Sequence, residues 1–322
     1  MRSKSFLDRD QPSVVLSFDF EMRWGVHHLH GLEIDEYREN LENCRPAVLG
    51  MLTLLEERGL RATWATVGAL GLNSWDEYFT LAPPPPRYIN PMFAIKRNYA
   101  EIDPAGVLHF APDLITKIIN TKGQELGSHS FSHILFGEPG VTANDFLMDL
   151  TAVNNLYLNR FGIKATSLVY PCNQYKFTDL LSQVGIKQWR GPEVGWFFES
   201  NTQKENTPLP RALRLIDSVN PFSSRASYPE SEMLRASLFV RFSLPEPLWS
   251  LHLAIIKNEL SNLKSGSVIH LWWHPHNLGF NLSQRLKRAS QLFDIIAELC
   301  QVSKLVSKNM NDFLPNKVPD EA

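Results

Sequence analysis

Short apolar runs alternate with amphipathic stretches along most of the chain, and this alternation predicts a regular succession of strands and helices. The run at 13–19 is apolar and ends in an acid, as expected for a buried strand. The stretch at 44–58 has apolar residues at helical spacing and stops at Gly59. The same alternation predicts further strands at 61–67, 124–128, 165–170, 186–189, 267–273 and 302–306, and further helices at 113–121, 142–160, 178–184, 249–263 and 283–299.

Repeated strand–helix–strand steps favour parallel strands covered by helices. About seven such units favour a barrel over an open sheet, so the predicted fold class is an α/β barrel of about seven parallel strands. We expect one domain over residues 1–322, with its core at about 13–310. Two irregular stretches interrupt the pattern, an insertion at 75–112 with no predicted helix or strand and a second stretch at 199–229. Each is expected to be either a rim of the functional site or a surface loop.

Polar side chains follow four of the predicted strands, and active sites of parallel α/β folds lie at such strand ends. Asp19 and Glu21 follow the first strand on the same side of the chain. Two carboxylates this close would repel each other, so they require a nearby cation or a shared proton. The alternative is that one of them caps a loop or pairs with Arg23. His129 and His133 follow the strand at 124–128, and two histidines with one carboxylate form a metal-ligand set that leaves positions open for water.

The other two clusters are weaker signals when each is taken alone. Pro171 forces a sharp exit from the strand at 165–170, and the backbone N–H groups that follow either stabilise an oxyanion or begin a plain loop. His274 ends the strand at 267–273 as the best-placed proton donor, whereas His270 lies deeper and reads as structural. The remaining histidines near the motifs are expected to lie in solvated loops: His27, His28, His30 and His276. For His27, His28 and His30, contact with substrate or with a metal is the alternative.

Composition narrows the classes of protein further. The 322 residues carry a formal net charge of -2, which lacks the basic excess that nucleic-acid binding requires. No apolar run reaches the roughly 20 residues of a membrane span. The start of the chain has no apolar signal core, and the three cysteines are widely separated. We therefore expect a cytoplasmic protein with no nucleic-acid partner.

Five motifs occur in a definite order over roughly residues 13–280: Ser17-Phe18-Asp19-Phe20-Glu21, Ala62-Thr63-Trp64, Gly127 to His133, Tyr170 to Gln174 and His270 to Asn277. In this order they resemble the polysaccharide deacetylases of the NodB-homology type. Within that family they resemble the branch that carries Asp-x-Glu or Asp-x-Asp in place of adjacent aspartates. The resemblance implies a distorted (β/α) barrel of about seven strands and a divalent metal, usually zinc, with cobalt or nickel as alternatives.

Carried over to this sequence, the resemblance implies that Glu21, His129 and His133 bind the metal. Asp19 would act as the general base and His274 as the general acid in hydrolysis of an amide. The sequence has Asp-x-Glu rather than adjacent aspartates. The resemblance therefore implies that both Asp19 and Glu21 take part in the reaction, and it defines less well which of them is the base and which binds the metal.

The resemblance also implies that the backbone around Tyr170 and Asn173 holds the oxyanion. Cys172 departs from the family pattern, because related branches often carry there an arginine that pairs with the basic aspartate. We expect Arg190 to supply this cation and Cys172 to be a small packed residue, with a metal ligand or a reactive thiol as alternatives. Four aromatic residues near the motifs are expected either to stack on sugar rings or to pack in the core: Trp24, Trp189, Trp196 and Trp272.

These expectations converge on a metal-dependent amidohydrolase that removes an acetyl or formyl group from a sugar. With no export signal, the expected substrate is a cytoplasmic N-acylated sugar, nucleotide- or lipid-linked, or a saccharide precursor of a surface polysaccharide such as the O-antigen of lipopolysaccharide. Two alternatives stay open. One is a non-catalytic saccharide-binding member of the fold, which the missing arginine at Cys172 favours, and the other is a hydrolase of another C–N bond, as in allantoinase-like relatives.

Overall fold

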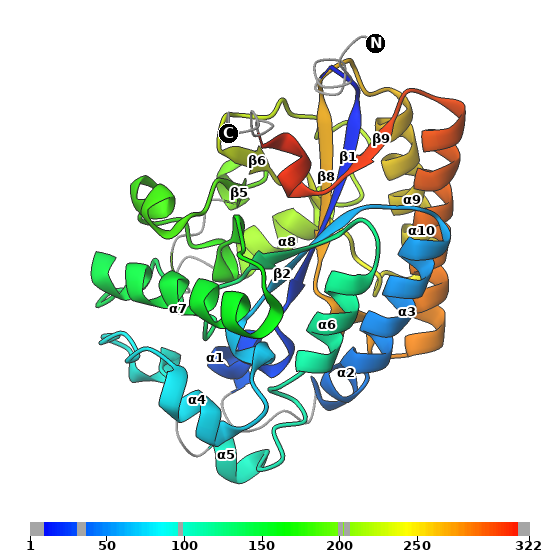
Figure 1. The fold of residues 1–322 in the computed structure, drawn as a ribbon. Helices are drawn as coiled ribbons and strands as arrows, with labels where there is room; N and C mark the ends of the chain where they lie inside the picture. The colour runs from blue at the N-terminus through cyan, green and yellow to red at the C-terminus, as the bar shows by residue number, and fades with distance from the viewer. Residues whose placement is uncertain (1–9, 31–36, 96–98, 199–201, 203–206, 315–322) are drawn as a thin grey trace.

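One curled parallel sheet organises the molecule (Figure 1). The computed structural model describes residues 10–30, 37–95, 99–198, 202 and 207–314. Within these residues the sheet has nine strands in the order β6-β5-β4-β3-β2-β1-β8-β7, and β9 pairs with β1. The strands are β1 (Ser13–Phe20), β2 (Ala62–Thr66), β3 (Gln124–Ser128), β4 (Ser167–Val169), β5 (Gln188–Gly191), β6 (Met233–Arg235), β7 (Leu238–Phe239), β8 (Val268–Trp273) and β9 (Val306–Lys308).

The edge strands β6 and β7 are joined by Ala236 and Ser237 alone, so the sheet curls back on itself and forms the expected distorted barrel. All eight residues of β1 are buried, which explains its continuous apolar pattern, because a central parallel strand is covered on both faces. Seven strands were predicted, and each corresponds to an observed one. The last begins later than expected, at Val306, because the preceding helix continues to Val302.

Helices cover the sheet on both sides, and α3, α6, α9 and α10 lie together along one of them (Figure 1). Within the described part of the chain, none of the helices is long and apolar enough to cross a bilayer. The α-helices are α1 (His27–His30), α2 (Arg38–Glu42), α3 (Cys44–Glu57), α4 (Trp75–Leu81), α5 (Tyr99–Ile102), α6 (Pro112–Asn120), α7 (Ala143–Phe161), α8 (Pro208–Asp217), α9 (Glu246–Ser261) and α10 (Leu282–Val302). The helix predicted at 178–184 is a 3-10 helix.

The insertion at 75–112 has helices of its own, so the prediction that it lacks regular structure was wrong. Its first helix, α4, begins after Ser74, whose side chain accepts a hydrogen bond from the backbone N–H of Glu77. Trp75 and Tyr78 then bury their rings in the core. Similarly, α8 lies within the irregular stretch at 199–229.

The sheet is least continuous between β3 and β4, whose register contains the single pair Ser128 and Leu168. The two larger apolar clusters both include side chains of α7. The larger one fills the space between the sheet and the helices α3, α6, α9 and α10. The smaller one joins β4 to α7 and includes Phe146 and Tyr170.

Candidate active site

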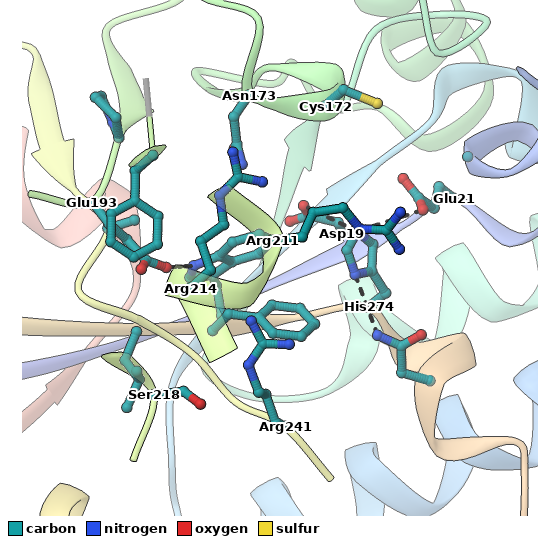
Figure 2. Close-up of a pocket in the computed structure, with 18 of the residues that line it drawn as sticks. Asp19, Glu21, Cys172, Asn173, Glu193, Arg211, Arg214, Ser218, Arg241 and His274 are labelled. Carbon is teal, nitrogen blue, oxygen red and sulfur yellow. Dashed lines mark hydrogen bonds and ion pairs between the residues drawn. The ribbon is translucent and has the colours of Figure 1, made fainter. Parts of the chain in front are cut away.

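The carboxyl ends of the strands open into one cleft of about 660 Å³ (Figure 2). All strands point the same way, so the residues that follow them gather at one end of the barrel. The lining includes residues from each of the four polar motifs: Asp19, Glu21, His133, Cys172, Asn173 and His274. The fold thus brings together side chains that lie up to 255 positions apart in the sequence.

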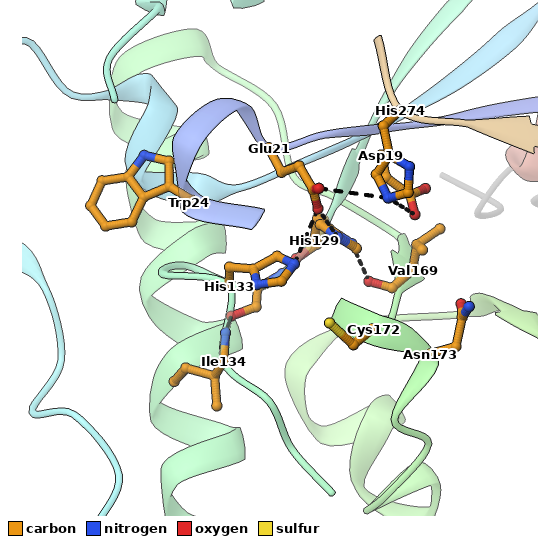
Figure 3. Close-up of polar contacts among 12 residues, drawn as sticks. Asp19, Glu21, Trp24, His129, His133, Ile134, Val169, Cys172, Asn173 and His274 are labelled. Carbon is orange, nitrogen blue, oxygen red and sulfur yellow. Dashed lines mark hydrogen bonds and ion pairs between the residues drawn. The ribbon is translucent and has the colours of Figure 1, made fainter. Parts of the chain in front are cut away.

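Glu21, His129 and His133 form a compact group whose potential ligand atoms all lie within 4.8 Å of one another (Figure 3). Oε2 of Glu21 is 3.1 Å from Nε2 of His129 and 3.1 Å from Nε2 of His133. The backbone carbonyl of Val169 lies 2.8 Å from Nδ1 of His129, so that nitrogen donates and Nε2 presents its lone pair. Two imidazoles and a carboxylate in this arrangement fit zinc or a similar divalent metal.

A buried aspartate on α7 fixes the loop that carries the two histidines. Asp149 accepts hydrogen bonds from the backbone N–H of Phe131 at 2.9 Å and from Oγ of Ser130 at 3.1 Å. Ser130 and His133 both have left-handed backbone conformations, with φ of 67° and 55°. The loop therefore turns sharply twice, and both rings point at Glu21.

The carboxylate of Glu21 packs directly against the backbone of Gly25. A Cβ atom at position 25 would come within 1.9 Å of the Glu21 carboxyl carbon, so only glycine leaves room for the carboxylate. Burial raises the pKa of Glu21, but His274 and His133 oppose this effect and hold the pKa well below its usual value. The group is therefore ionised, as a metal ligand must be.

Arg190 makes the contact that sequence analysis expected of it. Its guanidinium donates two hydrogen bonds to the Asp19 carboxylate, at 2.7 and 2.8 Å, and a third to Oγ of Ser17 at 3.1 Å. Burial raises the pKa of Asp19, but the charge and hydrogen bond of Arg190, together with the charges of His129 and His274, outweigh this effect and the pKa falls below its usual value. Arg190 lies on β5, and it supplies the cation that is missing at Cys172.

His274 faces both carboxylates from the end of β8. Its Nε2 lies 3.7 Å from Oδ2 of Asp19 and 3.6 Å from Oε1 of Glu21, and its side chain is 24% exposed to the cleft. His270 is fully buried with Nε2 at 2.8 Å from Oγ of Ser17, and burial lowers its pKa to about 3. His270 is therefore buried, as expected, whereas His274 lines the cleft.

Two of the expected substrate residues, Trp24 and Tyr170, have buried side chains. Trp24 is 1% exposed, and its indole N–H donates to the carbonyl of His109 at 2.7 Å, so its ring cannot stack on a sugar. The ring of Tyr170 is also fully buried, which leaves only its backbone for an oxyanion. The backbone N–H of Asn173 donates to the carbonyl of Tyr170 at 3.0 Å, while Oδ1 of Asn173 accepts from Arg190 at 3.3 Å.

His27 and His28 are buried, so the expectation of a solvated loop was wrong for them. They form a second histidine group with His133, and Nε2 of His28 lies 3.6 Å from Sγ of Cys172. His30 lies where the structure describes no side chain. His276 is also buried and lines the cleft.

No family model and no curated protein matches the sequence. Solved structures do match, and one is a protein from Mycobacterium smegmatis described as a polysaccharide deacetylase. It is 14% identical, aligns over 95% of this chain and 90% of its own, and gives a TM-score of 0.57. The chain has the polysaccharide deacetylase fold. A 4-alpha-glucanotransferase from Thermococcus litoralis also matches, with 12% identity, a TM-score of 0.51 and coverage of 97% of this chain and 41% of that one.

The polysaccharide deacetylase fold is therefore close to that of an enzyme with another activity, and the function has to be argued from the cleft itself. Sequence analysis missed one group of residues there, Glu193, Arg211, Arg214 and Arg241. The spacing of Arg211 and Arg214 places both on one face of a helix, but α8 lay in a stretch with no predicted helix. Glu193 and Arg241 follow short strands, where no periodic pattern marks them.

Proposed function

We propose that the protein is a metal-dependent hydrolase that removes an acetyl or formyl group from an N-acylated sugar. The observation that carries this proposal is the meeting of three groups in one cleft. These are a buried carboxylate–dihistidine set, a second carboxylate held by Arg190, and a histidine that faces both carboxylates. Binding of a saccharide without reaction does not require this combination of groups. Amide hydrolysis, in contrast, uses a metal site, a base and an acid.

In this mechanism Glu21, His129 and His133 would hold the metal. A bound divalent metal supplies Lewis acidity toward water and toward the acyl carbonyl. Asp19 would accept a proton from the attacking water, since Arg190 keeps its carboxylate ionised. The water oxygen bonds to the carbonyl carbon, the C–N bond breaks, and the acyl group leaves as a carboxylate.

His274 would give its proton to the sugar amine as that bond breaks. Its Nε2 lies close to both carboxylates at the cleft, within reach of a group bound there. The proposed substrate is a nucleotide- or lipid-linked sugar or another precursor of a surface polysaccharide, and the proposed location is the cytoplasm.

The first test is the metal content of the purified protein, measured by elemental mass spectrometry. We expect about one zinc-like metal per chain and its loss in His129→Ala and Glu21→Ala, because each substitution removes one of three protein ligands. Asp113→Asn, at the protein surface beside Arg45, is the matched control and should keep the metal. Wild-type protein that binds no metal after incubation with zinc, cobalt or nickel would refute the hydrolase.

The metal-loaded protein is then assayed on N-acetyl and N-formyl sugars, with release of acetate or formate as the readout. Turnover of ureides or cyclic amides, without turnover of N-acyl sugars, would instead favour the allantoinase-like reaction. Saccharide binding by metal-loaded protein without any turnover would favour the non-catalytic alternative. That alternative rested on the missing arginine, whereas in this chain Arg190 donates to Asp19 at 2.8 Å.

A further inference from the structure

A second group of three histidines lies beside the proposed metal ligands. His27 and His28 come from α1, and His133 also belongs to the first group. Each of the three offers one ring nitrogen, and these nitrogens all lie within 4.8 Å of one another. The rings of His28 and His133 are stacked with 5.9 Å between their centres, and the ring of His27 stands at 81° and 84° to them. All three side chains are buried.

His27 is surrounded by more acceptors than one neutral imidazole can satisfy. Its Nδ1 lies 2.5 Å from the carbonyl oxygen of Trp24, and its Nε2 lies 3.3 Å from that of Phe93. A neutral imidazole carries a hydrogen on only one nitrogen, and burial disfavours the second proton that would charge the ring. The shorter contact places the hydrogen on Nδ1, so Nε2 turns its lone pair towards a carbonyl oxygen. Such a contact is unfavourable unless a cation lies nearby.

His133 also has a nitrogen whose bonding is incomplete. Its Nε2 faces Glu21 at 3.1 Å, whereas its Nδ1 is buried and makes no hydrogen bond within the described part of the chain (Figure 3). The other proposed histidine ligand differs, because Nδ1 of His129 donates to the carbonyl of Val169. A buried polar atom without a bond has lost its solvation without compensation. The ring of His133 therefore gains from a partner in addition to the one at Nε2.

The donor atoms of this second group select the kind of ion that it fits. Imidazole nitrogens suit zinc and other divalent transition metals, whereas magnesium and calcium prefer oxygen ligands. A thiol lies beside the group, since Sγ of Cys172 is 3.6 Å from Nε2 of His28. His28, His133 and Cys172 all line the cleft. An ion held by three histidines keeps a coordination position open, here on the side of the cleft.

We propose that His27, His28 and His133 bind a second divalent ion, zinc or a similar metal, beside the ion held by Glu21, His129 and His133. This inference goes beyond the proposed function, which requires only the first ion. The second ion should bind more weakly, because its ligands include no carboxylate and because the two cations repel each other. The protein as purified should therefore keep the first ion and take up the second from added metal.

The test is a zinc titration of metal-stripped protein by isothermal titration calorimetry, with bound zinc counted by elemental mass spectrometry after equilibrium dialysis. The wild type should bind about two zinc ions per chain, the second at least about tenfold more weakly than the first. His27→Gln and His28→Phe should each weaken the second ion by at least about tenfold and leave the affinity for the first unchanged. Saturation of the wild type at one ion per chain would overturn the inference.

His252→Gln is the matched control. His252 is also a buried histidine, with Nδ1 at 2.6 Å from the carbonyl oxygen of Ser218, but it belongs to neither group. This variant should keep both ions. A second zinc ion that binds equally well to wild type, His27→Gln and His28→Phe would be an adventitious ion only and would overturn the inference. Thermal unfolding shows whether each metal-free variant is folded, and His28→Phe carries the test alone if His27→Gln is not.

The second ion and the proposed function fail separately. Glu21→Ala should lose the first ion and keep the second, since Glu21 is not part of the second group. Hydrolysis of an N-acyl sugar by a protein that binds a single ion at every zinc concentration would remove this inference and leave the proposed function intact. A second ion that depends on His27 and His28, in a protein that hydrolyses no N-acyl sugar, would do the reverse.

Discussion

Asp19 and Arg190 form a buried bidentate pair, and this pair sets the protonation of the proposed base. Burial raises the pKa of Asp19, and Arg190 is the largest of the influences that lower it. A base with a raised pKa stays protonated, and so inactive, up to a higher pH. We therefore expect Arg190→Met to move the acid limb of the kcat/KM profile upward by about 1–3 pH units.

The measurement is a pH–rate profile of metal-loaded Arg190→Met with an N-acyl sugar. Arg225→Met is the matched control, because Arg225 is also a buried arginine in an ion pair, with Glu259, but it does not line the cleft. Arg225→Met should lower the free energy of unfolding without moving the acid limb of the kcat/KM profile. An Arg190→Met enzyme whose activity falls equally at every pH would show that Arg190 acts only on folding.

At the scale of single residues, the sequence was enough to predict the polar residues that follow strands. It was not enough to predict side-chain positions that depend on tertiary contacts. Glu21, His129 and His133 were found because each follows a strand in a fold that gathers strand ends. Whether the ring of Trp24 would face solvent or the core depends on the packing of α4 and the segment around His109, which no local pattern shows. The cleft arginines were missed for the same reason.

Gly25, in the 3-10 helix Met22–Gly25 that follows β1, packs against the carboxylate of Glu21, a proposed metal ligand. We expect Gly25→Ala to displace the Glu21 carboxylate, since the new methyl group would come within 2.5 Å of each of its carboxyl atoms. Zinc affinity should fall by about 10- to 100-fold, as is common for changes beside metal ligands. Calorimetric titration with zinc measures this change, while the thermal unfolding of the metal-free protein should show a retained fold.

Gly50→Ala on α3 serves as the control, because its Cβ would meet only the side chain of Leu286, at 2.8 Å. Its zinc affinity should equal that of the wild type. Unchanged zinc binding in Gly25→Ala would mean that Glu21 does not contribute to the site.

At the scale of elements, the missed strands are short and the missed helices lie within irregular stretches. Seven strands of three to eight residues were found, but β6 and β7, with three and two residues, were not. The helices α4 and α8 lie beside prolines and irregular segments, which hid their periodicity. A short element carries too few residues for a period to show, and its position depends on the strand that it pairs with.

Glu125 links four parts of the molecule at the end of the sheet away from the cleft. Its carboxylate accepts from Oγ1 of Thr63 at 2.7 Å and from the backbone N–H of Asn311 at 3.0 Å, and it contacts Oγ of Ser167. Burial raises its pKa from 4.5 to about 7. The folded protein therefore binds this proton more tightly than the unfolded chain.

It follows that ionisation of Glu125 lowers the free energy of unfolding as pH rises from about 4.5 to 7, by roughly 3 kcal/mol in total. Glu125→Gln should remove this part of the pH dependence, because an amide keeps the neutral hydrogen-bonding state. Urea unfolding at pH 5 and pH 8 measures it. The same pH dependence in both proteins would mean that Glu125 ionises freely in the folded state.

For the whole molecule, the alternation of apolar runs with amphipathic stretches was enough to predict a parallel α/β barrel. The curling of the sheet depends on the two-residue link between β6 and β7, which no sequence period marks. The division of the core into several apolar clusters was also beyond reach, because it depends on which side chains pack together across the fold.

The seam between β3 and β4 has a consequence for how such a chain can diverge. The proposed metal ligands and Asp19 belong to segments that precede β4, whereas Arg190, which pairs with Asp19, and His274, which faces it, belong to segments that follow β4. The proposed reaction centre is therefore encoded in both halves of the sequence. Lineages with this architecture can vary the later half of the gene only where selection does not have to preserve these two residues.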